Sequence, residues 1–154
     1  MATSPHLYVD ADACPVKTEV FRVAARHDLH VTLVCGTWMR VPVDPRIRLE
    51  IVERGFDAAD DWIVERVEPG DIVVTTDIPL ASRCLAKGAA AIGTSGRPFT
   101  EDNIGDAMAS RALLADLRGA GESTKGPAAF TPRDRSHFLR ALEEAVQTSR
   151  RAGR

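Results

Sequence analysis

The chain has few of the residues on which disulfide-rich proteins and zinc proteins depend. It contains three cysteines, Cys14, Cys35 and Cys84, which are odd in number, widely spaced and without a C-x-x-C pair. This pattern predicts neither a disulfide framework nor a zinc site. We therefore expect three reduced thiols.

Long apolar runs and a strong charge imbalance are also missing. No window approaches the roughly 18 apolar residues of a membrane-spanning helix, and residues 1–6 lack the basic start and apolar run of a secretion signal. The net charge is −2 at pH 7 and the basic residues are spread along the chain. We expect a cytoplasmic protein with no membrane partner, and charge neither supports nor excludes a nucleic-acid partner.

The length of 154 residues fits one domain, because a chain of this size buries about two-thirds of its unfolded surface. We expect a single domain over residues 1–154, with residues 149–154 as a disordered tail. The sequence does not indicate an oligomeric state.

Short apolar runs alternate with segments of helical spacing along most of the chain. Strands are predicted near residues 7–10, 30–35, 47–53, 72–76 and 89–94. Helices are predicted to begin near residues 16, 57, 79, 100 and 131, and the fourth of them to end near residue 118. Parallel strands need crossover connections, so this alternation predicts an α/β fold with a mainly parallel central sheet and helices on both faces.

Aspartates stand at the ends of two predicted strands. Asp10 and Asp12 follow the first apolar run, and Asp77 follows the run 72–76. Open α/β sheets bind ligands at the carboxyl edge, where these side chains are expected to meet. A pair of acids, Asp60-Asp61, opens a predicted helix. Any one of these aspartates has an ordinary alternative role as a helix cap or turn former.

Several carboxylates at one edge repel one another unless a cation lies between them. Oxygen donors suit Mg²⁺ or Mn²⁺ better than zinc, and such ions typically assist phosphoryl chemistry. The predicted metal ligands are Asp10, Asp12, Asp61 and Asp77, and the predicted catalytic group adds Asp60. The sequence does not decide which of the pair Asp60-Asp61 faces the metal and which caps the helix.

A phosphodiester substrate would need polar and cationic contacts near the metal. The predicted substrate-binding residues are Arg40, Arg83, Arg97, Asn103 and Lys125. Each Arg or Lys has an ordinary alternative as a solvated surface charge.

Three further side chains have a chemical and a structural interpretation. The Cys14 thiol lies beside Pro15 at a predicted helix start, but no base or second cysteine is near it in the sequence, so a packed residue is favoured over a nucleophile. Trp38 and Trp62 are interpreted as packing residues. Of the two, Trp38 lies in the irregular stretch 36–45 and is the better candidate for stacking on a base.

Four segments together resemble the YaiI/YqxD family of uncharacterised bacterial proteins. They are Val9-Asp10-Ala11-Asp12-Ala13-Cys14-Pro15-Val16, residues 55–63, Thr76-Asp77-Ile78-Pro79-Leu80-Ala81, and residues 96–105. The resemblance runs roughly from Leu7 to Leu142.

That family is in turn similar to PIN-like and NYN nuclease domains. Their three acidic segments correspond here to Asp10, to Asp60-Asp61 and to Asp77, in the same order along the chain. The resemblance implies a PIN-like three-layer domain and a Mg²⁺- or Mn²⁺-dependent nuclease, more often acting on RNA than on DNA. Asp12 and the Cys14-Pro15 pair are not general to those nucleases.

Two alternatives remain. Asp10-x-Asp12 at a strand end is also the signature of haloacid-dehalogenase-like phosphatases, which use one Mg²⁺ and an aspartyl-phosphate; the position of Asp60-Asp61 before Thr75-Thr76 and Lys87 argues against it. The second alternative is a protein that binds nucleic acid or a nucleotide without cutting it.

Overall fold

The computed structural model of the chain describes residues 4–12, 14–53, 58–105 and 130–152. The strands of this part of the chain form one six-stranded sheet in the order β3-β2-β1-β4-β5-β6. The strands are β1 (Leu7–Asp10), β2 (Val31–Cys35), β3 (Ile47–Ile51), β4 (Ile72–Val74), β5 (Ala90–Ile92) and β6 (Pro98–Phe99).

The sheet is parallel from β3 through β5, as the alternating sequence pattern predicts. The edge strand β6 runs antiparallel, against β5. The sequence predicts a loop there, because two residues are too few to establish an alternating pattern. The hairpin is made by a tight turn in which Gly93 N donates to Arg97 O at 2.8 Å and Gly96 adopts a φ of 91°.

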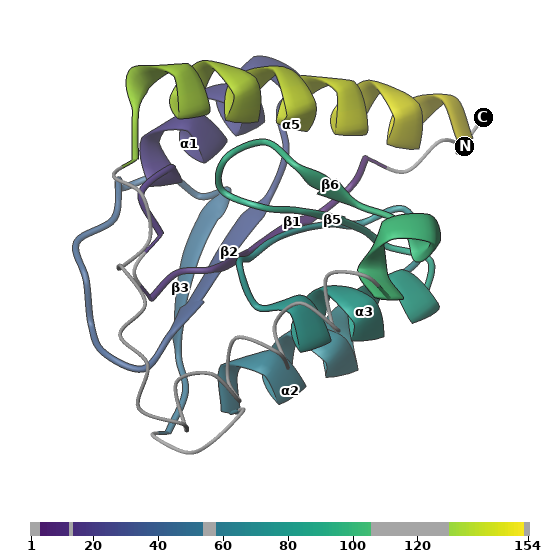
Figure 1. Cartoon of the computed structure of the whole chain (residues 1–154). Coiled ribbons are helices and arrows are strands. Elements are labelled where there is room, and N and C mark those ends of the chain that lie inside the picture. The colour runs from purple at the N-terminus through teal and green to yellow at the C-terminus, as the bar shows by residue number, and fades with distance from the viewer. Residues whose placement is uncertain (1–3, 13, 54–57, 106–129, 153–154) are drawn as a thin grey trace, which may run out of the picture.

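Helices cover both faces of the sheet. On one face lie α1 (Lys17–His27) and α5 (Pro132–Ala152), and on the other lie α2 (Ala58–Arg66) and α3 (Ile78–Ala86), as Figure 1 shows. The predicted three-layer α/β fold with a mainly parallel central sheet is therefore confirmed.

Each face of the sheet has its own hydrophobic core. On the α1/α5 face, Phe138 and Leu142 of α5 are fully buried against Leu33 of β2 and its neighbours. On the α2/α3 face, Ile63 and Leu80 are fully buried in the second core. The central strands are apolar on both sides, which is typical of a parallel sheet.

The last helix begins where the sequence predicts but ends later. Its start is confirmed: the Thr131 and Asp134 side chains each accept the other's backbone N–H, at 3.2 and 3.0 Å. At the other end α5 continues to Ala152, so the predicted tail does not begin at residue 149. Ser149 donates its hydroxyl to Gly70 O at 2.6 Å, which ties this turn to the rest of the protein.

One predicted helix is only partly described. Residues 101–105 are helical, and Thr100 and Asn103 cap this start by exchanging side-chain and backbone hydrogen bonds. The predicted continuation to residue 118 and the predicted loop 119–129 lie outside the described residues.

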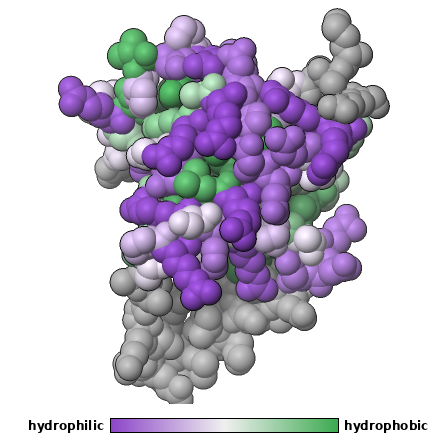
Figure 2. All heavy atoms as spheres, turned by 90° about the horizontal axis from the view of Figure 1, so that it is seen from above, coloured by the Kyte–Doolittle hydropathy of each residue, from purple (hydrophilic) through white to green (hydrophobic). Residues whose placement is uncertain are grey.

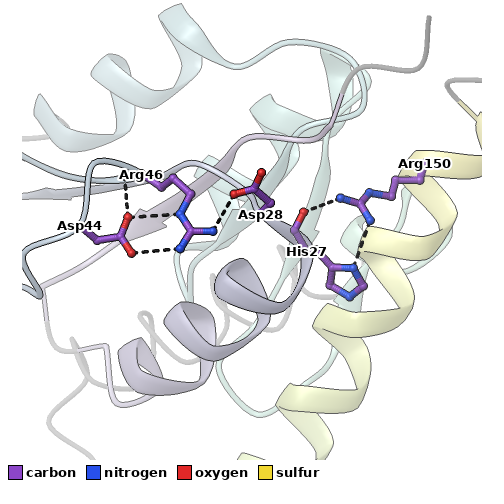
Figure 3. Close-up of polar contacts among 5 residues, drawn as sticks. All are labelled: His27, Asp28, Asp44, Arg46 and Arg150. Carbon is purple, nitrogen blue, oxygen red and sulfur yellow. Dashed lines mark hydrogen bonds and ion pairs between the residues drawn. The ribbon is translucent and has the colours of Figure 1, made fainter.

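A series of polar contacts joins α5, α1 and the segment that leads into β3 (Figure 3). Arg150 donates to the His27 carbonyl at 2.6 Å and to His27 Nδ1 at 3.1 Å, and the Arg46 guanidinium bridges Asp28 and Asp44. Since arginine only donates, Nδ1 accepts, and the His27 Nε2–H donates to Glu143 at 2.7 Å. These contacts lie at the end of α1, where Asp28 adopts a left-handed φ of 57°.

Candidate functional site

Asp10 ends β1 at the point where the strand order of the sheet reverses. The chain runs outward from β1 to β2 and β3, and then returns to place β4 on the other side of β1. Ligands of open α/β sheets bind at such a reversal, outside the carboxyl ends of the strands. The β1–β4 pairing brings Asp10 beside the residues that follow β4.

A buried threonine connects the two strand ends. The Thr75 hydroxyl donates to Asp10 Oδ2 at 2.9 Å and accepts the Asp77 backbone N–H at 2.9 Å. Thr75 is only 1% exposed, so this geometry is fixed by the core. Thr75 is not among the site residues that the sequence predicts. The register of β1 and β4, which sets Val9 beside Val74, is the signal that leads to it.

Asp77 has a structural contact as well as a place at this edge. Its Oδ1 accepts the Leu80 N–H at 2.9 Å and caps α3, which has Pro79 near its start. The ordinary role of a strand-end aspartate is therefore present here. The cap holds the Asp77 carboxyl group at the carboxyl edge of the sheet, and the site role of Asp77 stays a prediction.

Asp12 lies in the loop after β1 and is oriented toward the end of β2. Its Oδ2 accepts the Gly36 N–H at 3.1 Å. A hollow of about 330 Å³ opens beside it, lined by Asp12, Gly36, Thr37, Val52, Glu53, Ala58 and Ala59. Glu53 lies just after β3 and is not among the site residues that the sequence predicts.

Burial and neighbouring charges change the pKa of the Asp10 carboxyl group. Burial raises the pKa of the Asp10 carboxyl, the Thr75 hydrogen bond opposes this, and the charges of Asp77 and Asp12 raise the pKa further. The charges of two of the predicted carboxylates, Asp77 and Asp12, therefore act on Asp10. This repulsion is what a bound cation would relieve.

The Asp60-Asp61 pair lies in the first turn of α2. Asp61 forms an ion pair with Arg83 of α3 at 2.9 Å, and both side chains are about half exposed. The charge of Asp60 contributes to the raised pKa of Cys84 on α3, although burial is the main cause. Asp61 therefore contacts α3, whereas Asp12 and Asp77 lie near Asp10.

The predicted substrate-binding residues are dispersed. Arg83 is engaged by Asp61, and the Asn103 side chain donates to Pro98 O at 3.0 Å while it caps the 101–105 turn. Arg40 is exposed in the loop after β2. Arg97 is exposed in the β5–β6 turn. Lys125 lies outside the described residues.

The donor chemistry fits a hard divalent cation that keeps part of its water. Carboxylate oxygens are the ligands Mg²⁺ prefers, and Mg²⁺ is usually held by one or two carboxylates with water in the other positions. In the described part of the chain, no group of three or more His, Cys, Asp or Glu side chains is spaced to hold a metal directly. Of the described carboxylates, Asp10, with Asp12 and Asp77 near it, is the group that would hold such an ion.

Cys14, Trp62 and Trp38 differ in their exposure and in their neighbours. Cys14 is 6% exposed, and burial is the main reason that the pKa of its thiol is raised, which favours a packing role over that of a nucleophile. Trp62 stacks under the Arg66 guanidinium and meets Tyr8 edge-on. Trp38 is 73% exposed.

A larger hollow, of about 1120 Å³, lies elsewhere, along α5 and the β5–β6 hairpin. Figure 2 looks onto the α5 side and shows hydrophobic residues among mostly hydrophilic ones. The lining includes Ile92, Phe99, Ala141 and Ala145, and none of the predicted carboxylates. Size alone therefore does not identify the chemical site.

No helix in the described ranges is both long and apolar enough to cross a membrane.

Comparison with known proteins identifies the family. A family model described as "Uncharacterized BCR, YaiI/YqxD family" matches residues 8–148. A UPF0178 protein of Rhodopseudomonas palustris (strain ATCC BAA-98 / CGA009) is 61% identical over 141 residues, covering 92% of this chain and 89% of the relative. A UPF0178 protein of Caulobacter sp. (strain K31) is 57% identical over 148 residues, covering 96% and 98%. The chain belongs to the YaiI/YqxD family.

Proposed function

We propose that the protein is a divalent-metal-dependent phosphodiesterase that acts on nucleic acid, with RNA favoured over DNA. The observation that supports this most directly is the Asp10–Thr75–Asp77 connection at the strand-order reversal. The Thr75 hydroxyl connects the Asp10 carboxylate to the Asp77 backbone, and the charges of Asp77 and Asp12 act on Asp10. Carboxylates gathered in this way are suited to a cation with oxygen ligands.

Mg²⁺ or Mn²⁺ held there would polarise a phosphoryl oxygen and lower the pKa of a bound water. The chain's own part is to position the ion and the substrate. Asp10 would provide the central oxygen ligand, Thr75 fixes the orientation of that carboxyl group, and Asp12 borders the hollow beside Gly36. Asp60 and Asp61, at the start of α2, would act at the outer side of the site.

The preference for RNA rests on the resemblance to PIN-like and NYN domains. It has a partial physical support in the loop after β2, which exposes Trp38 and Arg40 two and four residues beyond the Gly36 contact to Asp12. An exposed indole stacks on unpaired bases, and a nearby guanidinium binds phosphate.

The first experiment is calorimetric titration of Mn²⁺ into the wild type and into Asp10→Asn and Asp77→Asn variants. Saturable binding to the wild type that both substitutions weaken is expected. Asp102→Asn is the matched control, since Asp102 is an exposed aspartate in the 101–105 turn. Equal binding by all four proteins would contradict a carboxylate site at Asp10.

The second experiment compares labelled single-stranded RNA, single-stranded DNA and a phosphomonoester as substrates, with Mn²⁺ or with a chelator. Metal-dependent cleavage of RNA that Asp10→Asn abolishes is expected. Release of phosphate from the monoester alone would favour the haloacid-dehalogenase-like alternative. Metal and RNA binding without turnover would favour the non-catalytic alternative.

A further inference from the structure

The edge strand β3 and the segment that leads into it expose large apolar side chains. Among the described residues, the large hydrophobic side chains that are exposed are Trp38 at 73%, Val43 at 106% and Ile51 at 49%. All three lie between residues 38 and 51, in β3 or in the segment that leads into it. In the described sheet β3 pairs only with β2, so its other side is an edge.

The backbone of β3 alternates in the direction of its hydrogen-bonding groups. Arg46 O accepts from Val31 N at 2.8 Å, and Val52 N donates to Cys35 O at 2.9 Å. Even-numbered residues of this strand therefore point their N–H and C=O groups toward β2. The groups of Ile47, Leu49 and Ile51 point away from β2, and of these the Ile47 N–H is already bonded to Asp44 O at 3.0 Å.

The side chains of this strand are self-complementary when two copies run antiparallel. The sequence Ile47-Arg48-Leu49-Glu50-Ile51 reads as apolar, positive, apolar, negative, apolar. With Leu49 opposite Leu49 of the second copy, Arg48 lies opposite Glu50 and Ile47 lies opposite Ile51. We propose that β3 is a dimerisation edge, at which two copies of this chain pair antiparallel around Leu49 and join their sheets.

The outward backbone groups agree with this register. Leu49 would exchange its N–H and C=O with Leu49 of the second copy, and the Ile51 N–H would donate to the Ile47 carbonyl. Arg48 and Glu50 then fall at a non-hydrogen-bonded pair, where the strands come closest and side chains interact most strongly. Both charged side chains thus meet where their attraction is largest.

The charges also select against other registers. A shift of the pairing by two residues would set Arg48 opposite Arg48, or Glu50 opposite Glu50, at the centre of the contact. Like charges directly opposite each other are unfavourable. An open edge strand would otherwise pair with unrelated strands, and charge is a common way to restrict this.

Within one chain, Arg48 and Glu50 form an ion pair at 3.1 Å, with side-chain exposures of 72% and 24%. Exposed pairs of this kind contribute little to stability, so exchanging the partner within the chain for one in the second copy costs little. Ile51 would lose water contact against Ile47. The contact is short, and we expect a concentration-dependent dimer rather than an obligate one.

The pairing does not depend on any activity at Asp10. Because the two copies run antiparallel, the carboxyl edges of their sheets, and with them the two Asp10 groups, would face in opposite directions. Each copy would keep its own site open.

Sedimentation velocity over a wide concentration range tests the pairing with charge reversals. The wild type is expected to approach twice the monomer mass, whereas Arg48→Glu and Glu50→Arg should each raise the dissociation constant at least about tenfold, because each creates like-charged pairs. Mixing the two variants should restore the dimer, since the glutamate introduced in one chain then lies opposite the arginine introduced in the other. Within each variant chain positions 48 and 50 remain alike in charge, so recovery on mixing reports the contact between chains.

Arg151→Glu is the control, because it reverses an exposed charge at the end of α5. Circular dichroism checks that each variant is folded. For the wild type alone, hydrogen exchange at the Leu49 and Ile51 amides should slow as concentration rises. A wild type that stays monomeric with concentration-independent exchange at these amides, or a dimer that neither reversal weakens, would overturn the proposal.

Discussion

Asp10 carries a carboxylate that the fold makes costly to keep charged. Burial and the charges of Asp77 and Asp12 raise its pKa, and the hydrogen bond from Thr75 only partly compensates. An uncharged side chain of the same shape that still accepts the hydrogen bond from Thr75 should therefore make the metal-free protein more stable than aspartate does. Such an excess of like charge is frequent where a site is built for a ligand rather than for stability.

We predict that Asp10→Asn stabilises the metal-free protein near neutral pH by roughly 0.5–2 kcal/mol. The amide oxygen can still accept from Thr75 Oγ1, while the buried charge and its repulsion from Asp77 and Asp12 are removed. Chemical denaturation in the presence of a chelator measures the difference. A lower unfolding free energy for the variant would show that the Asp10 charge is compensated in the folded state.

The same comparison has a defined dependence on pH. The folded-state pKa of Asp10 lies above the unfolded value, so the folded protein takes up a proton first as the pH falls. At neutral pH we expect the free energy of unfolding to be lower for the wild type than for Asp10→Asn. This difference should shrink as the pH falls through the folded and then the unfolded pKa of Asp10. The two unfolding free energies should converge in acid, and a difference that widens in acid would contradict the raised pKa.

Trp38 provides a second test at single-residue scale. Met39 and Val41 pack against the core, while Trp38 and Arg40 are exposed, so the loop presents alternate side chains to solvent. We predict that Trp38→Ala changes stability by less than about 0.5 kcal/mol and weakens single-stranded RNA binding by about 1–3 kcal/mol. Trp62→Phe is the matched control, because Trp62 is covered by Arg66 and Tyr8.

Fluorescence titration with RNA in that Trp62→Phe background reports Trp38 alone. Quenching on RNA addition is expected. Unchanged emission together with unchanged affinity of the alanine variant would remove Trp38 from the binding surface and leave the carboxylate site unaffected.

At the scale of elements, α5 is tied to α1 and to the segment that leads into it. Arg135 Nη1 donates to Pro15 O at 2.8 Å and to Glu19 Oε1 at 3.1 Å, although the two partners lie more than a hundred residues earlier in the chain. Glu19 is 8% exposed, and its Oε2 is buried with no hydrogen-bond partner among the residues that the structure describes. Arg135 is therefore the cation that makes the buried carboxylate tolerable.

We predict that Arg135→Ala destabilises the protein by about 1–3 kcal/mol, because it leaves the Glu19 carboxylate buried and unpaired. A double-mutant cycle with Glu19→Ala should be strongly non-additive, since the second substitution removes the group that the first one left unpaired. Thermal and chemical unfolding of the four proteins measures this. Additive effects would mean that the two side chains act independently.

The elements that the sequence predicted correctly are those with a long or strongly apolar pattern. The runs at 31–35 and 72–74 became buried parallel strands, and the Thr131 start of α5 was identified from its capping residues. The two-residue β6 was missed because pairing with β5, not local pattern, defines it. The end of α5 was placed too early because Ser149 is held by Gly70, a contact invisible in the sequence.

The candidate site was predicted where it depends on strand ends and less completely where it depends on side-chain partners. Asp10 and Asp77 follow from the rule that parallel strands end at one edge. The Thr75 link, the Asp61–Arg83 ion pair and the proximity of Glu53 to Asp12 depend on register and on how α2 packs beside α3. Spacing along the chain contains none of this information.

At the scale of the whole molecule, metal binding at the carboxyl edge should stabilise the fold by mass action. A ligand that binds only the folded state raises its stability by about 2.7 kcal/mol at a hundred times the dissociation constant. We predict that Mn²⁺ raises the melting temperature of the wild type in a saturable way, and that Asp10→Asn and Asp77→Asn remove most of this increase.

Asp61→Asn is the informative comparison in that melting experiment. Asp61 is engaged by Arg83 on the surface of α2 and α3, whereas the charges of Asp12 and Asp77 act on Asp10 at the carboxyl edge of the sheet. The Asp61 variant should therefore retain most of the Mn²⁺-dependent increase in melting temperature. If it loses as much as Asp77→Asn, the Arg83 pair must open when metal binds, and Asp61 joins the metal ligands. If no variant changes the increase, the ion binds elsewhere and the strand-end carboxylates have a different role.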